Sequence, residues 1–107
     1  MDLAVTAYKC CLALPRHEVF GLASQLRRAA SSIPSNIAEG HGRTSANEYL
    51  YFLGVARGSL AELETQLLLA QRIGYLTVQQ ATELQDGIDE VSRILHAVMA
   101  SQKRRSH

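Results

Sequence analysis

The sequence predicts an all-α protein, an antiparallel up-down-up-down four-helix bundle, and two observations lead to this prediction. Apolar residues recur at helical spacing along almost the whole chain of 107 residues. Only two prolines and seven glycines interrupt that pattern, and short connections between helices favour antiparallel neighbours. We expect one domain over residues 1–102, followed by a basic C-terminal tail at residues 103–107.

The first helix is expected from Asp2 to Leu14, because Pro15 disfavours a helical conformation in the residue before it. Val5, Tyr8 and Leu12 follow one another at spacings of three and four residues, and Ala4 and Cys11 widen this stripe. This stripe is expected to face the core.

The second helix is expected from about His17 to His41, with Pro34 in its interior. A proline there removes one hydrogen bond and crowds the carbonyl four residues back, so we expect a kink. Serine and asparagine side chains beside it can bond the freed backbone groups. The expected apolar side consists of Phe20, Leu22, Leu26, Ala30, Ile33 and Ile37.

The third and fourth helices open with capping signals, Ser45 with Glu48 and Thr77 with Gln80, and Gly74 should end the third. Heptad steps of three and four define one apolar seam in each. The seam of the third helix is Tyr49, Leu53, Ala56, Leu60, Leu63, Leu67 and Ala70. The seam of the fourth is Ala81, Leu84, Ile88, Val91, Leu95 and Val98.

Composition narrows the classes of function. A net charge of +1 gives no global reason to expect a nucleic-acid or membrane partner. The chain has no apolar run of membrane length and no secretory pattern, and the adjacent Cys10 and Cys11 fit reduced core or interface thiols, so we expect a cytoplasmic protein. The histidines form no metal-binding pair on a helical face, and we expect no cofactor, metal or small-molecule substrate.

Gly54 and Gly58 form a small-xxx-small pair in the third helix. Each glycine costs about 1 kcal/mol against alanine in a helix, so the pair indicates close approach by another helix. The serine-rich part of the second helix is the expected neighbour. The third helix also has more apolar surface than one seam uses, which either widens the core stripe or forms a self-association surface.

Asn36, Glu39, Arg57 and Glu62 allow three interpretations. They can form a buried polar network that fixes helix register, a solvated face, or a catalytic group, and we favour the network. A second polar set is either solvated or a nucleic-acid contact: Arg27, Arg28, Arg43, Lys103, Arg104 and Arg105.

Two long segments carry a family resemblance: SQLRRAASSIPSNIAEGHGR at 24–43 and EYLYFLGVARGSLAELETQL at 48–67, with GYL at 74–76. They resemble the four-helix-bundle family associated with intervening sequences of bacterial 23S rRNA genes. The resemblance implies a small bundle, commonly a ring-shaped homopentamer. It also implies that SIPSNIAEG (32–40) and ARGSLAELE (56–64) act in packing and assembly.

The same family includes an accessory protein of diversity-generating retroelements, similar in fold, which binds a reverse transcriptase and nucleic acid through a basic surface. The near-neutral charge of this chain departs from those strongly basic members. We therefore expect a non-enzymatic, homo-oligomeric bundle, with a pentamer implied by the resemblance, that acts as an interaction or scaffold module. The alternative is an accessory protein that binds RNA or DNA.

Overall fold

The computed structural model describes residues 2–18 and 20–106, and the regular structure within them is helical. Met1, Val19 and His107 lie outside the described residues. The all-α class is therefore confirmed for the part of the chain described. The elements are α1 (Asp2–Ala13), the 3-10 turn η1 (Arg16–Glu18), α2 (Leu22–His41), α3 (Ala46–Ile73) and α4 (Val78–Arg105).

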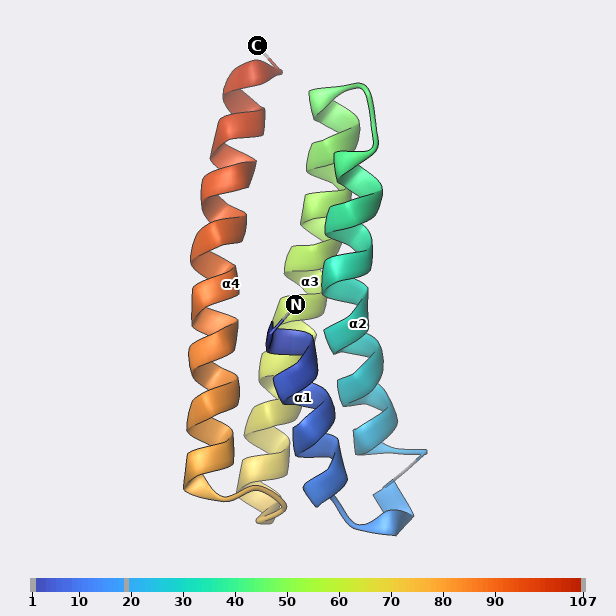
Figure 1. The fold of residues 1–107 in the computed structure, drawn as a ribbon, viewed down its shortest axis with the longest axis vertical. Helices are drawn as coiled ribbons and strands as arrows, with labels where there is room; N and C mark the ends of the chain where they lie inside the picture. Colours follow the sequence, from blue (N-terminus) through green and yellow to red (C-terminus); the bar gives the residue numbers. More distant parts are fainter. Residues whose placement is uncertain (1, 19, 107) are drawn as a thin grey trace.

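The four helices pack into an elongated bundle that measures 48 × 23 × 18 Å. Figure 1 shows the chain running downward in α1, upward in α2, downward in α3 and upward in α4. The packed pairs are α1 with α2, α2 with α3, α3 with α4, and α1 with α4. Consequently α1 lies diagonally opposite α3, and α2 lies diagonally opposite α4.

Local signals explain where α3 and α4 begin and where α3 ends. Ser45 Oγ accepts a hydrogen bond from the backbone N–H of Glu48 at 3.0 Å. Thr77 and Gln80 cap each other's backbone in a complete capping box. Gly74 closes α3 at φ 91°, a left-handed conformation that glycine adopts at little cost. All three predicted boundaries are confirmed.

The heptad seams of α3 and α4 face the core, as their spacing predicts. Every seam position of α3 from Leu53 to Ala70 is buried, and Leu63 is completely inaccessible. Tyr49, Val91 and Val98 are only partly buried. Tyr49 and Val98 pack against the small cluster in the upper half, and Val91 packs at the edge of the large cluster. Burial of a leucine side chain contributes about 1.5–3 kcal/mol, so these seams supply much of the stabilisation of the bundle.

The predicted core stripe of α1 is wrong at its three main positions, although Cys11 at its edge is buried. Val5, Tyr8 and Leu12 are 51%, 46% and 86% exposed. Another stripe with the same spacing of four and three residues is buried instead, and it consists of Leu3, Ala7, Cys10 and Leu14. Periodicity cannot choose between two equivalent stripes. The buried one carries the smaller side chains, Ala7 and Cys10, which let α1 lie close to its neighbours.

The start of α2 also differs from the prediction. The helix begins at Leu22, since the chain first forms the short turn η1, and the side chain of Phe20 is 97% exposed. From Leu22 onward the predicted apolar side holds, with Leu26 and Ile33 fully buried. The helix continues through Pro34 to His41 without interruption.

Cys10 and Cys11 are buried free thiols, as expected for core residues. Cys11 Sγ donates to the carbonyl of Ala23 at 3.5 Å, which joins α1 to α2. Burial raises the pKa of both thiols; for Cys11 the nearby guanidinium of Arg27 acts in the opposite direction. The thiols therefore stay protonated and contribute packing rather than nucleophilic character.

The glycines that allow close helix approach are not the predicted ones. A Cβ atom at Gly54 or Gly58 would meet nothing within 4 Å, so no helix of the described chain lies against them. A Cβ at Gly40 would lie 2.8 Å from Cβ of Phe52, and one at Gly87 would lie 3.0 Å from a side-chain atom of α1. Gly40 therefore lets α2 approach α3, and Gly87 lets α1 approach α4.

The bundle is not uniform along its length. With 12 residues against 28 in α4, α1 accompanies only the lower half of the bundle (Figure 1). A large core cluster occupies that half. The upper half contains a small second cluster of Leu53, Ala56, Leu95 and Met99. Among the described helices, none has the combination of length and apolar character needed to cross a membrane.

Candidate interaction surfaces

A small polar network joins α2 to α3. Ser32 Oγ and Ser59 Oγ lie 2.7 Å apart, and Asn36 Nδ2 donates to Ser32 Oγ at 2.9 Å. The same amide donates to the Ser32 carbonyl at 2.8 Å, in the turn that contains Pro34. Ser59 is only 7% exposed, so its bond to Ser32 satisfies a hydroxyl that water scarcely reaches.

The network predicted from Asn36, Glu39, Arg57 and Glu62 is not formed. Asn36 is partly buried, whereas the three charged residues are exposed. Glu39 pairs with Arg43 on the surface, one turn further along the chain. Arg57 and Glu62 are five residues apart, about 140° around a helix, so their side chains point in different directions.

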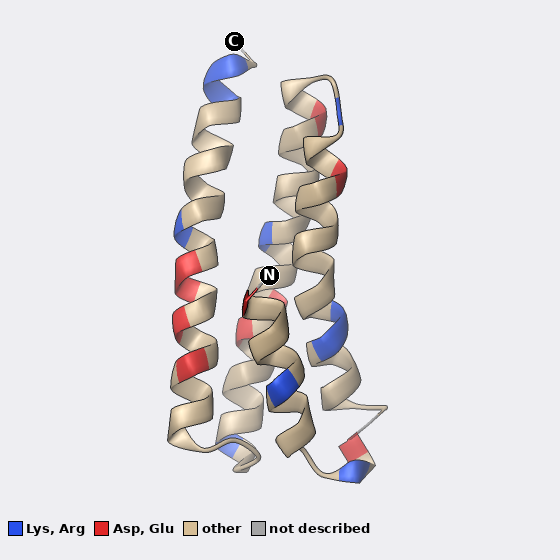
Figure 2. Cartoon of the chain, viewed as in Figure 1, with Lys and Arg blue, Asp and Glu red and all other residues tan. Residues whose placement is uncertain are grey.

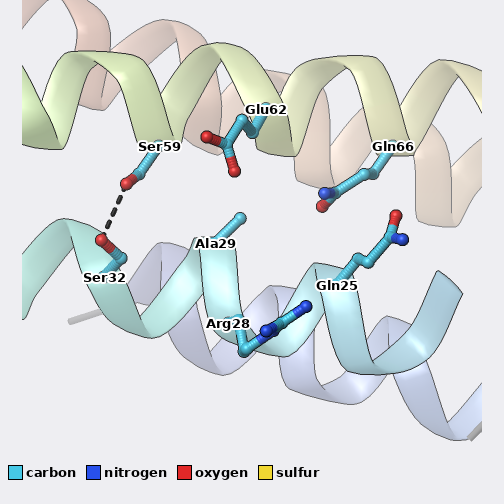
Figure 3. Close-up of a pocket in the computed structure, with 7 residues that line it drawn as sticks. All are labelled: Gln25, Arg28, Ala29, Ser32, Ser59, Glu62 and Gln66. Carbon is cyan, nitrogen blue, oxygen red and sulfur yellow. Dashed lines mark hydrogen bonds between the residues drawn. The ribbon is translucent and has the colours of Figure 1, made fainter. Parts of the chain in front are cut away.

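A polar cleft lies beside the serine pair, between α2 and α3, with a volume of about 560 Å³. Its lining residues, drawn in Figure 3, are Gln25, Arg28, Ala29, Ser32, Ser59, Glu62 and Gln66. Figure 3 shows Arg28 rising from α2 and Glu62 descending from α3, and within the described residues the two form no ion pair. Gln66 Oε1 is buried without a partner among the described groups. The cleft is therefore lined mainly by polar side chains, and one buried acceptor among them has no partner within the described residues.

An apolar groove lies on the other side of α2, between it and α1. Its volume is about 560 Å³. The residues that the sequence placed in the core, Val5, Tyr8 and Leu12, line it together with Pro34 and the aliphatic stem of Lys9. Pro34, which has no backbone N–H to donate within α2, thus contributes its ring to the lining of the groove.

Exposed apolar side chains lie on the outside of α3 toward its two ends, with the exposed Glu62 between them on the same side of the helix. Tyr51, Val55, Leu69 and Ile73 are 66%, 37%, 49% and 49% exposed, and their spacing places them on one side of the helix, away from the seam. Gly54 and Gly58 lie along the same stretch with open space before them. We call this row the α3 outer row. The exposed apolar residues that the sequence left unassigned are thus on the surface and do not widen the core.

Four of the predicted basic residues lie at one end of the bundle, where Figure 2 also shows acidic segments near the end of α2 and at the start of α3. α4 continues through Lys103, Arg104 and Arg105, which the sequence assigned to a tail, so these three exposed residues form its last turn. Arg43, in the connection from α2 to α3, lies at the same end and shares a cleft of about 290 Å³ with Arg105. Arg28, in contrast, lies in the lower half of α2 beside the polar cleft.

Arg27, the remaining member of the predicted basic set, is partly buried and lies close enough to Cys11 to offset part of the rise that burial causes in the pKa of that thiol. The structure therefore brings four of the six predicted basic residues to one end and leaves Arg27 and Arg28 elsewhere on α2.

Tyr75, a residue that no local sequence pattern distinguishes, connects η1 to the turn between α3 and α4. The Tyr75 hydroxyl donates to Glu18 Oε2 at 3.0 Å, and His17 Nε2 lies 3.2 Å from the same hydroxyl. Glu18 Oε1 accepts from the backbone N–H of Leu22 at 3.2 Å and so satisfies one of the free backbone donors at the start of α2. The partners are more than 50 residues apart in the chain, and no local spacing signals such a contact.

Within the described residues, no group of three or more histidine, cysteine, aspartate or glutamate side chains is placed to hold a metal ion. The features that remain are surfaces: two apolar, one polar and one basic.

Comparison with known proteins identifies a family. The model of the 23S rRNA-intervening sequence protein family matches residues 1–97, which is most of the chain. No curated protein matches the sequence.

Proposed function

We propose that this chain, which belongs to the 23S rRNA-intervening sequence protein family, is a self-assembling, non-enzymatic scaffold module. Copies associate through the apolar groove between α1 and α2 and through the α3 outer row. The resemblance described above implies five copies in a ring. The assembled ring, rather than the single bundle, presents the surface that partners recognise.

The observation that carries this proposal is the exposure of large apolar side chains on two faces of a small bundle. Extended apolar surface on a soluble domain usually marks an interface. On the α3 outer row, Gly54 and Gly58 leave space for the backbone of a second copy to lie close to α3. Each glycine weakens the isolated helix, and a close contact between copies offsets that cost.

The position of the two faces favours a ring. Because α1 lies diagonally opposite α3, the groove and the outer row are on different sides of one copy. A contact between the groove of one copy and the outer row of the next is heterologous, and such contacts give a closed ring when the rotation between copies closes.

Sedimentation and light scattering at micromolar concentration test the proposal. The expected species has five times the chain mass of 11.8 kDa. Leu12→Glu in the groove or Val55→Glu in the outer row should each give an 11.8 kDa monomer, because a buried unpaired carboxylate is costly. Val78→Glu is the matched control, since Val78 is 78% exposed in the first turn of α4, where an acid is favourable.

Mixing the two variants tests the heterologous contact. Leu12→Glu retains an intact outer row, and Val55→Glu retains an intact groove, so an equimolar mixture should form a dimer of two different chains and stop there. A mixture that stays monomeric would contradict pairing of these two faces. A wild-type protein of 11.8 kDa at micromolar concentration would contradict self-assembly altogether.

A second candidate function is binding of RNA or DNA, and the gathering of Arg43 with Lys103, Arg104 and Arg105 at one end favours it (Figure 2). Symmetry would repeat this basic end in every copy. Binding should then weaken steeply with salt, as counterion release requires. Replacement of Lys103, Arg104 and Arg105 by Gln should abolish retardation of RNA on a gel at low salt, whereas replacement of Arg27 and Arg28 by Ala should not.

A further inference from the structure

The cleft at the basic end combines features that suit one chemical group. It lies between the connection from α2 to α3 and the last turns of α4, and its volume is about 290 Å³. Its lining residues are His41, Arg43, Thr44, Ser45, Ala46, Tyr49, Val98, Gln102 and Arg105. Two arginines, one histidine and three hydroxyl-bearing residues are among them, and none of the nine carries a carboxylate.

Arg43 is held in place from two sides. It forms an ion pair with Glu39, and its guanidinium carbon lies 4.9 Å from the centre of the Phe52 ring. Stacking and pairing restrict the side chain, so less conformational entropy is lost when a ligand binds. Glu39 engages one nitrogen of Arg43 and does not line the cleft, which leaves other guanidinium donors for a ligand.

Arg105 is positioned by a buried amide. Gln102 follows Val98 by four residues, so it occupies the next position of the heptad seam, where an apolar residue is expected. Its side chain is only 7% exposed, and its Oε1 accepts a hydrogen bond from Arg105 Nη1 at 3.4 Å. A buried amide is costly compared with an apolar side chain. The seam thus ends in a polar residue that holds an arginine beside the cleft.

Backbone donors add to the side chains. Ala46 opens α3, a helix of 28 residues, and its N–H belongs to the first turn, where amides lack acceptors within the helix. Such a helix start favours an anion. Ser45 Oγ already accepts from Glu48, and its hydroxyl hydrogen remains available to an acceptor.

We propose that this cleft binds a phosphate monoester, the group that a nucleotide or the end of a nucleic-acid strand presents. Arg43 and Arg105 contact the phosphate oxygens from opposite sides, and the first turn of α3 supplies neutral donors. Gln102 is a positioning residue that acts through Arg105. The inference does not depend on self-assembly, and it specifies which part of a nucleic acid the second candidate function would recognise.

Titration of the full chain with inorganic phosphate, followed by amide NMR shifts, is the first test. Saturable shifts should concentrate at the α2–α3 connection and the last turns of α4. Arg105→Gln should weaken phosphate binding roughly three- to tenfold. Arg104→Gln is the matched control, because it removes the same charge from the same helical turn but does not line the cleft; it should change binding less than about twofold.

The Gln102→Leu variant distinguishes a role of Gln102 in positioning Arg105 from a role in folding. Leucine suits the seam, so the variant should unfold at higher urea concentration than the wild type while its phosphate affinity falls. Equal losses of phosphate affinity in Arg104→Gln and Arg105→Gln would show that the basic residues attract phosphate without a defined site, and would overturn the proposal. Unchanged affinity in Gln102→Leu would overturn the positioning role, and a lack of saturable shifts would overturn the site.

Short RNAs that differ only at one end distinguish the sources of phosphate. An RNA with a terminal phosphate should bind more tightly than the same RNA with a terminal hydroxyl, and free phosphate should compete the difference away. Equal affinity for both RNAs would support general nucleic-acid binding but contradict recognition of the terminal group. Binding of free phosphate without this preference would restrict the ligand to small phosphates.

Discussion

At the scale of single residues, two helical glycines differ in the space around them, and alanine should therefore have opposite effects on stability at the two positions. Gly40→Ala should destabilise the chain, because its Cβ would lie 2.8 Å from Phe52 and the core resists overpacking by about 1–3 kcal/mol. Gly54→Ala should stabilise it by up to about 1 kcal/mol, since the new methyl group meets open space. Urea unfolding in a Leu12→Glu background, which removes the proposed assembly surface, reports each effect on one chain. The same sign for both substitutions would contradict the assignment of close approach to Gly40.

Tyr75 gives a residue-scale prediction about pH. Its hydrogen bond to Glu18 raises the pKa of Tyr75 above the ordinary value of 10.0. The folded chain therefore retains this proton more firmly than the unfolded chain, and the contribution to stability is complete below pH 10 and is lost as pH rises through the folded pKa. Wild type and Tyr75→Phe should differ in urea midpoint at neutral pH and converge at strongly alkaline pH. A constant difference would show that the hydroxyl proton is not involved.

At the scale of elements, the serine pair reports on the packing of α2 against α3. Ser32→Ala removes the partner of the buried Ser59 hydroxyl, and an unsatisfied buried group costs about 1–3 kcal/mol. Ser59→Ala should cost less, because Asn36 still donates to Ser32. The loss of unfolding free energy in the double variant should be smaller than the sum of the losses in the two single variants. A double-mutant cycle measured by urea unfolding tests this difference. Additive effects would contradict a direct interaction across the two helices.

Some features of the helices follow from local sequence spacing, and others depend on how the helices pack. The seams of α3 and α4 and the caps at Ser45, Thr77 and Gly74 follow from local spacing, and all are confirmed. Two stripes of α1 have equal spacing, and only the shape of the neighbouring helices decides which is buried. Contacts that join distant segments, such as Tyr75 with Glu18, leave no local signal.

Some parts of the candidate surfaces can also be predicted from the sequence, and others depend on the fold. Surplus apolar residues on α3 are visible in the sequence and lie on the surface, whereas the groove beside Pro34 depends on which stripe of α1 faces outward. The basic cleft depends on the fold, because Arg43 and Arg105 are far apart in the chain. The buried position of Gln102 follows from extending the heptad one step beyond Val98.

At the scale of the whole molecule, the short α1 leads us to expect that the two halves of the bundle differ in stability. The lower half contains the large core cluster with α1, whereas the upper half relies on Leu53, Ala56, Leu95 and Met99. Regions with fewer buried apolar contacts open at lower free energy. Native-state hydrogen exchange should therefore show weaker protection in residues 94–105 of α4 than in residues 80–90.

Phosphate binding and loss of assembly should change the hydrogen-exchange protection of the two halves in different ways. Phosphate in the basic cleft would bridge the α2–α3 connection to the last turn of α4 and should raise protection in the upper half, because a ligand stabilises the state that binds it. Loss of assembly in Leu12→Glu should instead lower protection in α1 and the adjoining face of α2. Uniform protection along α4 without any ligand would show that α1 is not what stabilises the lower half, and that the bundle unfolds as one cooperative unit.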